Sequence, residues 1–198
     1  HDNHVYGLTK KQASPTSPKG LKSNTTPYGA TLEPMNPLTV SLGVQGASFI
    51  AQGVDWVPEV LYDIVRAAFK HRGFSFVRIL QRCPEFMPKA FDPWLHDPQR
   101  TMLLTHADGI QLSPSLSMAY RNQRVHDPID IDRAREIASL DDPIPVGILY
   151  RNPDAPCYED LRHAGQMRSP EYIRAGLNRE LDKYTVWPDD EAQTQRAA

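Results

Sequence analysis

The amino-acid sequence predicts an α/β fold with a parallel sheet, followed by an extended, loop-rich C-terminal arm. Residues 55–70 carry apolar side chains at the one-face spacing of a helix, and segments of strand character lie on both sides of it, at 49–51 and 74–80. A strand, a helix and a strand joined by short connections form the unit from which parallel sheets are built. The 18 prolines exceed the average share of about 5% and concentrate in residues 15–37 and in the second half, which indicates extended loop there.

Each element of the first half has its own local signal. Five prolines interrupt residues 13–37, so neither a helix nor a central strand persists there and a long ordered loop is expected. Pro37 precedes residues 38–44, which we interpret as a short helix rather than a buried strand. Asp55 stands at the expected N-cap of the long helix. The cations and the glycine of residues 70–73 suit its C-terminus.

From about residue 90 the character of the chain changes, because Asp-Pro pairs divide it into short pieces. These pairs are Asp92-Pro93, Asp97-Pro98, Asp127-Pro128 and Asp142-Pro143. The elements expected beyond them are a helix at 132–140, a strand at 144–150 and a helix at 170–183 with Ser169 as its N-cap. We therefore expect residues 1–90 to form part of one domain. Residues 91–198 are expected to be an arm that wraps a larger assembly instead of building a second core.

The charge and composition exclude several classes of protein. The 22 basic and 24 acidic residues give a formal charge of −2 without a basic block, so nucleic acid is not an expected partner. No apolar run approaches the roughly 20 residues that cross a bilayer, so no membrane association is expected. Two cysteines cannot form a disulfide framework, and a cytoplasmic protein fits best.

Motifs of several common enzyme classes are missing from the sequence. It contains no Gly-x-Ser-x-Gly elbow, no P-loop and no Gly-x-Gly-x-x-Gly run. The seven histidines are scattered, without the tight spacing of a zinc site. Serine hydrolases, nucleoside triphosphatases and Rossmann dehydrogenases therefore lack their anchoring motif here.

The opening residues offer groups that suit a metal and a diphosphate. Asn3 supplies a neutral oxygen ligand for a hard cation, and Mg²⁺ commonly takes few protein ligands together with phosphate oxygens. Gly7 permits close backbone approach, Thr9 offers a hydroxyl, and Lys10 offers a cation. The simpler interpretation is that Asn3 is a turn residue, that Val5 is a buried side chain and that the lysine is only solvated.

The two cysteines differ in context. Cys83 directly follows the expected strand at 74–80, beside Pro84. It is either a buried free thiol or one ligand of an iron-sulfur cluster, which needs three further cysteines. Cys157 has no supporting context, and no role is assigned to it.

Residues 2–16, Asp-Asn-His-Val-Tyr-Gly-Leu-Thr-Lys-Lys-Gln-Ala-Ser-Pro-Thr, resemble the second half of the thiamine diphosphate site in the β subunits of 2-oxoacid:ferredoxin oxidoreductases. The later Gly-Phe-Ser-Phe-Val of residues 73–77 and Cys83-Pro84 match that family in order and spacing. The resemblance is strong over residues 1–90. It continues more loosely to residues 150–153, which are similar to the C-terminal region of the longer β subunits.

The resemblance implies a role for individual residues. Mg²⁺ would be held by an Asp of an upstream Gly-Asp-Gly, by Asn3 and by the backbone carbonyl of Val5. Cys83 would be the last of four cysteines that hold a 4Fe-4S cluster. The residues that would line the diphosphate cofactor are Gly7, Leu8 and Thr9, and those on the substrate side are Leu8 and Lys10.

The sequence also departs from the family pattern, because neither Gly-Asp-Gly nor the three upstream cysteines occur in it. These residues therefore hold half of each site. We expect them to be the C-terminal portion of a longer β subunit and to be inactive alone.

The resemblance implies a function for the complete assembly with its α subunit. That function is the coenzyme A-dependent oxidative decarboxylation of a 2-oxoacid with electron transfer to ferredoxin, or the reverse reaction. Lys10 could attract a second carboxylate, which favours 2-oxoglutarate over pyruvate. Three alternatives stay open: a pyruvate:ferredoxin oxidoreductase β subunit, a thiamine-dependent decarboxylase or synthase without iron, and a non-catalytic assembly module.

Overall fold

The computed structural model describes residues 1–107, 109–164 and 168–186. It divides into two units, His1–Cys157 and Tyr158–Ala198, which are described separately. The first unit contains a five-stranded sheet in the order β4-β3-β7-β5-β6. Its strands are β3 (Phe49–Val54), β4 (Ser75–Leu80), β5 (Thr101–Thr105), β6 (Gln123–Val125) and β7 (Ile144–Arg151).

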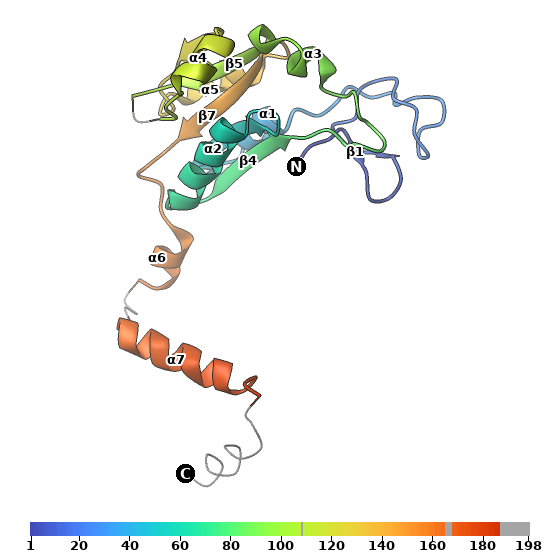
Figure 1. Ribbon diagram of the computed structural model, residues 1–198. Coiled ribbons are helices and arrows are strands. Elements are labelled where there is room, and N and C mark those ends of the chain that lie inside the picture. The colour runs from blue at the N-terminus through green and yellow to red at the C-terminus, as the bar shows by residue number, and fades with distance from the viewer. Residues whose placement is uncertain (108, 165–167, 187–198) are drawn as a thin grey trace. The chain divides into compact units, whose positions relative to one another are not determined.

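The sheet is mostly parallel, with one antiparallel neighbour pair. β3 runs parallel to β4, and β5 runs parallel to β6 and to β7. β7 lies antiparallel to β3 in the middle of the sheet. The predicted α/β class and the parallel strand-helix-strand unit are therefore confirmed, and the sheet as a whole is mixed (Figure 1).

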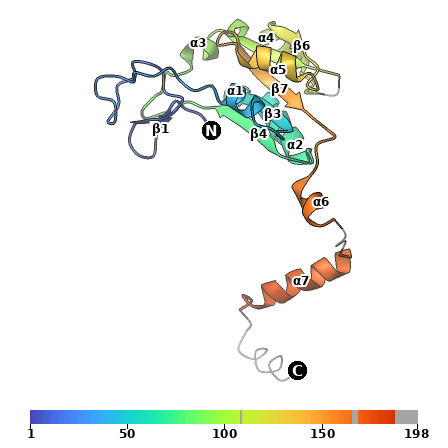
Figure 2. The ribbon, with the colours of Figure 1, turned by 180° about the vertical axis from the view of Figure 1, so that it is seen from behind.

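Helices cover both faces of this sheet and enclose two hydrophobic cores. Helix α2 (Pro58–Lys70) packs against β3 and β4 through its buried residues Val60 and Ile64. Helices α1 (Pro37–Leu42) and α5 (Ile131–Ala138) contact each other and build the second core (Figure 2). Shorter helices complete the unit: α3 (Asp92–Leu95), η1 (Pro98–Arg100) and α4 (Pro114–Ala119).

The helices and strands expected at 38–44, 49–51, 74–80, 132–140 and 144–150 are all present. The expected N-cap of α2 is wrong, because the helix begins at Pro58 and its N-cap is Val57. Asp55 instead continues the parallel ladder, since its backbone N–H donates to the carbonyl of Leu80 at 3.1 Å. Proline is well suited to open a helix, which explains the later start.

The interpretation of residues 91–198 as an arm without its own part of a core needs a correction. β5, β6 and β7 belong to the same sheet as β3 and β4, and Leu103 and Val146 lie in its core. The compact unit therefore extends to Cys157. The short strands β5 and β6 carry weak local signals, and pairing with neighbouring strands together with core packing of β5 stabilises them. The expected boundary near residue 90, between the thiamine diphosphate-binding domain and the C-terminal extension of the family, stays a prediction.

The second unit holds the predicted C-terminal helix. Helix α6 (Tyr158–Arg162) comes first, followed by α7 (Pro170–Asp182). Ser169 is the N-cap of α7 as expected, because its hydroxyl accepts a hydrogen bond from the N–H of Tyr172 at 3.2 Å. The end of the arm, residues 187–198, lies outside the described residues. Among the described residues, no helix has the length and apolar character to cross a bilayer.

The N-terminal segment forms a small hairpin with strands β1 (Val5–Tyr6) and β2 (Gln12–Ala13). The loop that follows reaches α1 at Pro37, as the prolines predict (Figure 1). Several hydroxyl groups hold this loop together internally. Thr25 accepts from the N–H of Ala13 at 3.0 Å and Thr26 donates to the carbonyl of Leu21 at 3.0 Å.

Candidate functional site

The first residues of the chain lie beside the carboxyl end of β4. The N–H of Asp2 donates to the carbonyl of Ile79 at 2.8 Å, and the N–H of Gln81 donates to the carbonyl of Asp2 at 3.1 Å. Asp2 therefore pairs with Leu80 in parallel fashion, as an additional strand would. The residues after Asp2 lie beyond the carboxyl end of β4, where ligands of open α/β sheets collect.

An ion pair fixes this opening segment to the sheet. The guanidinium of Arg78 in β4 donates to one carboxylate oxygen of Asp2 through Nη2 at 2.6 Å and through Nε at 2.9 Å. A third donor of Arg78, Nη1, binds Oε1 of the buried Gln52 at 3.1 Å. Such two-point contacts fix orientation as well as distance. The position of the opening loop is thus set by a charged group inside β4.

Asp2 is charged despite its burial. Burial by itself raises the pKa of this carboxyl group, but the hydrogen bond from Thr16 and the charge and hydrogen bonds of Arg78 outweigh it. The hydroxyl of Thr16 donates to the second oxygen of Asp2 at 2.6 Å. The net result is a pKa below the ordinary value for Asp. The carboxylate therefore links β4 to the long loop after the hairpin.

His4 adopts a conformation that L-residues rarely take, with φ at 64°. Three contacts hold it there. Its N–H donates to Asp2 at 3.1 Å, its carbonyl accepts from the hydroxyl of Ser17 at 2.6 Å, and its ring lies edge-on to Phe91. Asn3 and Val5 flank this backbone turn, and the Val5 side chain is buried. Local strain of this kind persists only where the surroundings over-determine it.

The structure brings together three of the predicted site residues. A Cβ atom added to Gly7 would stand 3.1 Å from Sγ of Cys83 and 3.7 Å from Nδ2 of Asn3. Cys83 is buried and begins the tight turn in which the N–H of Met87 donates to its carbonyl at 3.0 Å. The side-chain oxygen of Asn3 accepts from the N–H of Val5 at 3.1 Å and keeps a second lone pair.

The other predicted residues form the exposed turn of the hairpin. Leu8 is fully exposed, and the hydroxyl of Thr9 donates to the carbonyl of Tyr6 at 3.3 Å. Lys10 has φ at 65°, and its side chain is exposed. These three residues point away from the core of this unit, so they are available to a ligand or a second chain.

A cavity of about 310 Å³ lies against the opening loop. Asn3, Val5, Thr16 and Arg78 are among the residues that line it. Among the described residues, no group of three or more His, Cys, Asp or Glu side chains is placed to hold a metal ion. Asn3 and Cys83 could thus supply single ligands, and further ligands would have to come from outside the described part of the chain.

Two family models match this chain. Residues 1–79 match the C-terminal thiamine pyrophosphate-binding domain of thiamine pyrophosphate enzymes, and residues 117–165 match the C-terminal region of the pyruvate ferredoxin oxidoreductase β subunit. A 2-oxoacid:ferredoxin oxidoreductase β subunit from a Sulfolobus species is 33% identical over 175 residues, which are 87% of this chain and 53% of that protein. The chain belongs to the β subunits of the 2-oxoacid:ferredoxin oxidoreductases.

Further proteins similar to this β-subunit chain are named for 2-oxoglutarate. The 2-oxoglutarate oxidoreductase subunit KorB of Mycobacterium tuberculosis is 43% identical over 91 residues, 46% of this chain and 24% of that protein. A solved structure of 2-oxoglutarate:ferredoxin oxidoreductase from Magnetococcus marinus, with 2-oxoglutarate, coenzyme A and succinyl-CoA bound, matches with a TM-score of 0.63 and 29% identity. That match covers 89% of this chain and 55% of the solved chain, so this β-subunit chain spans about half the length of such relatives.

The residues that sequence reasoning missed are those that hold the loop of this β-subunit chain. Asp2, Arg78 and Gln52 form one buried polar network, yet only the neighbouring Asn3 stood out in the sequence. The available signal was Arg78 itself, a charged residue inside the otherwise apolar Phe-Val-Arg-Ile-Leu of β4. A buried arginine requires a partner, so its position in a strand predicts a carboxylate nearby.

Proposed function

We propose that this chain supplies half of a thiamine diphosphate and Mg²⁺ site, and one ligand of a 4Fe-4S cluster, in a 2-oxoacid:ferredoxin oxidoreductase. The complete enzyme would carry out the coenzyme A-dependent oxidative decarboxylation of a 2-oxoacid, or the reverse. The names of the relatives support this proposal, as does the thiamine pyrophosphate-binding domain model that matches residues 1–79.

One observation supports it most directly: Asn3, Gly7 and Cys83 lie together at the carboxyl end of β4. Sequence reasoning assigned Asn3 and Cys83 to two different cofactors, and the residues lie far apart in the chain. The fold makes them neighbours. An enzyme that removes electrons at an organic cofactor and passes them on to a cluster needs the two sites side by side.

The residues present fit the cofactor in part. Thiamine diphosphate, when bound, supplies a nucleophilic carbon and an electron sink for decarboxylation. Asn3 offers a second lone pair of Oδ1 to Mg²⁺, and the backbone carbonyl of Val5 offers another oxygen of the type that Mg²⁺ prefers. Because Gly7 has no side chain, Sγ of Cys83 and the side-chain amide of Asn3 lie close to its backbone.

The remaining residues of the loop have supporting roles in this proposal. Gly7, Leu8 and Thr9 line the cofactor, and the Asp2–Arg78 ion pair holds the loop that carries them. Lys10 places a cation on the exposed turn, where it would attract the second carboxylate of 2-oxoglutarate. This favours 2-oxoglutarate over pyruvate as the substrate.

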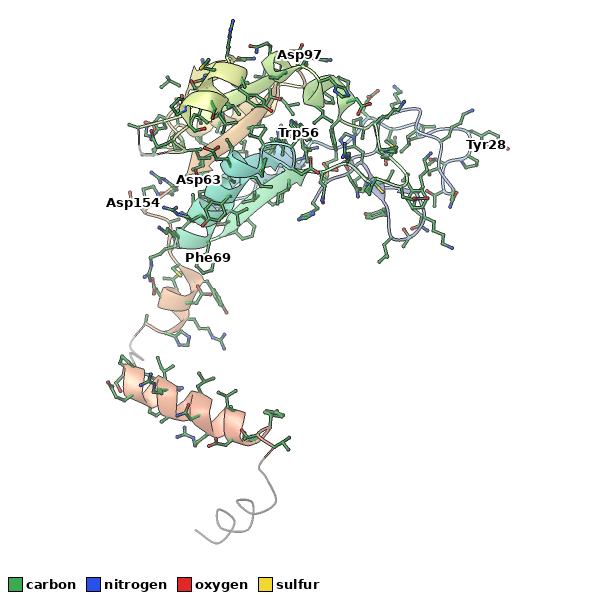
Figure 3. All side chains as sticks on the ribbon, viewed as in Figure 1. Tyr28, Trp56, Asp63, Phe69, Asp97 and Asp154 are labelled. Carbon is green, nitrogen blue, oxygen red and sulfur yellow. The ribbon has the colours of Figure 1, made fainter. Side chains whose placement is uncertain are left out.

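The proposal includes partners, namely an α subunit, ferredoxin, the 2-oxoacid and coenzyme A, in the cytoplasm. Relatives described as β subunits support an α partner. The exposed tip of the long loop, where Tyr28 is 98% exposed, offers a surface for such a subunit (Figure 3). Because the described residues hold only single ligands of each site, we expect residues 1–198 alone to be inactive.

The deciding experiment measures iron content and activity of the native complex with Cys83→Ser, beside the matched variant Cys157→Ser. We expect Cys83→Ser to lower bound iron and electron transfer to ferredoxin, while Cys157→Ser changes neither. The thiamine diphosphate content of the same variants shows separately whether the loop of Asn3 and Gly7 still binds its cofactor. Unchanged iron and activity in Cys83→Ser would favour the iron-free thiamine enzyme.

An assembly module makes a different prediction. Replacement of Asn3 by Ala would leave the turnover of the complex unchanged if the loop is only inherited structure. We expect instead that Asn3→Ala lowers the affinity for Mg²⁺ and thiamine diphosphate, measured by the cofactor concentration needed for half-maximal activity.

A further inference from the structure

A second cavity, larger than the one at the opening loop, lies at the other end of β4. It has a volume of about 760 Å³ and opens between the C-terminal half of α2, the end of β7 and the segment after β5. β4 begins at Ser75 next to this cleft and ends at Leu80 next to the loop of Asn3 and Gly7. The residues that line the cleft take no part in the function proposed above.

The lining of this cleft is strongly basic. It includes Arg66, Lys70, Arg72 and Arg151. The acidic lining residue is Asp63, which Figure 3 labels on α2. Within the described part of the chain, neither Arg66 nor Lys70 is ion-paired with a carboxylate. Since the whole chain has a net charge of −2, this concentration of cations is local.

A buried nitrogen of Arg151 has no hydrogen-bond partner among the described residues. Nε of this residue is inaccessible to solvent and unpaired, although the backbone N–H of the residue donates to Pro128 at 2.8 Å. A buried donor without an acceptor is costly. A helix C-terminus attracts cations, which accounts for Lys70 on α2 but not for Arg151 on β7.

The cleft also has a fixed wall and an apolar floor. His71 is hydrogen-bonded to the hydroxyl of Ser48 at 2.9 Å and lies against the ring of Phe49 at 5.5 Å. Apolar residues also line the cleft: Ala67, Ile110 and Ile148. Binding sites for small molecules commonly combine such a floor with a few polar groups, in volumes of roughly 300–1,000 Å³.

We propose that this cleft binds a phosphorylated small molecule with a diphosphate or triphosphate group and an apolar or aromatic body. Guanidinium groups match phosphate oxygens in geometry, and several cations around one cavity suit a multiply charged anion better than a single carboxylate. The phosphates would lie against Arg66, Lys70 and Arg151, and the body of the ligand would lie on the apolar floor. This proposal is independent of the function proposed for the loop of Asn3.

The test is a calorimetric titration of the native complex with ADP, pyrophosphate and adenosine. We expect saturable binding of ADP, weaker binding of pyrophosphate and none of adenosine. Because a complex of this kind has other diphosphate sites, the assignment depends on variants. The double variant Arg66→Gln with Lys70→Gln should weaken ADP binding at least about tenfold, the loss expected from one or two charged hydrogen bonds.

The matched control is Lys89→Gln with Arg121→Gln, two exposed cations outside the cleft whose loss changes the net charge by the same amount. It should change ADP affinity less than about twofold, since distant exposed charges are screened. Arg151→Lys keeps the charge but removes Nε–H, and it should weaken binding as well. No saturable ADP binding, an unchanged affinity in the first double variant, or equal losses in both double variants would overturn the proposal.

Discussion

Sγ of Cys83 lies 3.1 Å from the point where a Cβ atom on Gly7 would stand. The two residues lie far apart in the sequence, and the fold of the first unit places them next to each other. This distance is shorter than ordinary van der Waals contact, so any side chain at residue 7 must displace the cysteine or the loop.

Gly7→Ala is expected to lower the turnover of the native complex while the free energy of unfolding changes little. The added methyl group meets a buried sulfur atom, and the adjustment shifts either the cysteine or the loop that carries Gly7 and Asn3. The measurements are turnover, iron content and the free energy of unfolding. Gly176→Ala in α7 is the control, since a Cβ there meets nothing closer than 3.8 Å. A fully active Gly7→Ala complex would mean that the contact is unimportant.

The ion pair between Asp2 and Arg78 is expected to contribute strongly to stability. Their side chains are only 9% and 14% exposed, and removal of one partner leaves a buried charge unpaired. Asp2→Asn or Arg78→Met should therefore lower the free energy of unfolding by about 3–5 kcal/mol. The double variant should cost less than the sum of the two, because it leaves no unpaired charge.

The exposed pair of Asp132 and Arg135 on α5 is the matched control for that experiment. These side chains are 87% and 52% exposed, and their Nη1 and Oδ1 atoms lie 3.1 Å apart. Asp132→Asn should change stability by no more than about 0.5 kcal/mol. Equal effects at the buried and the exposed pair, measured by urea unfolding, would show that burial of the first pair is unimportant.

The pH dependence of stability should include a contribution from His71. Burial and then the charge of Arg151 lower the pKa of this side chain below its usual 6.5. The unfolded chain therefore binds the proton more readily than the folded one. The stabilisation is complete above pH 6.5 and is lost as the pH falls from there through the folded-state pKa.

His71→Gln should reduce this loss of stability on acidification, measured as the free energy of unfolding between pH 7.5 and about 5. His96→Gln is the control, because that side chain is exposed and lies outside the cleft. If both variants keep the full pH dependence of the parent protein, His71 is not its source.

The choice of substrate should depend on Lys10. Its exposed ammonium group stands on the hairpin turn, whose geometry is held by the hydrogen bond from Nδ2 of Asn24 to the Lys10 carbonyl at 2.6 Å. Lys10→Met should raise the KM for 2-oxoglutarate about tenfold, the effect of one lost charged contact, and change that for pyruvate little. Lys11→Met provides the control on the neighbouring residue. Equal changes in KM for both substrates would show that Lys10 does not recognise the second carboxylate of 2-oxoglutarate.

Local patterns in the sequence were sufficient for the elements that carry strong periodicity. The apolar stripe of α2, the strand character of β3 and β4 and the Ser169 cap of α7 are properties of short stretches, and each occurs where it is predicted. β5 and β6 were missed because each is short and lacks a distinctive pattern. β5 pairs with β7, and β6 pairs with β5. These pairings join distant segments, so a short stretch of sequence does not reveal them.

The candidate site shows the same division between local and distant information. The opening motif and Cys83 indicated which residues carry chemistry, through a resemblance that includes residue types and their order. Their placement depends on Arg78, a charged residue in an otherwise apolar strand whose partners the sequence does not identify. Only the fold shows that its guanidinium binds both Asp2 and Gln52, and thereby holds the loop in position.

The sequence by itself determined the α/β class, the strand-helix-strand unit and the identity of the opening loop. The physical reason is that helix periodicity, strand composition and capping act between residues close along the chain. The tertiary structure alone decided that β7 inserts antiparallel beside β3, that Gly7 and Cys83 meet, and that four cations line one cleft. These contacts join residues far apart in the chain, so they exist only once the whole sheet has formed.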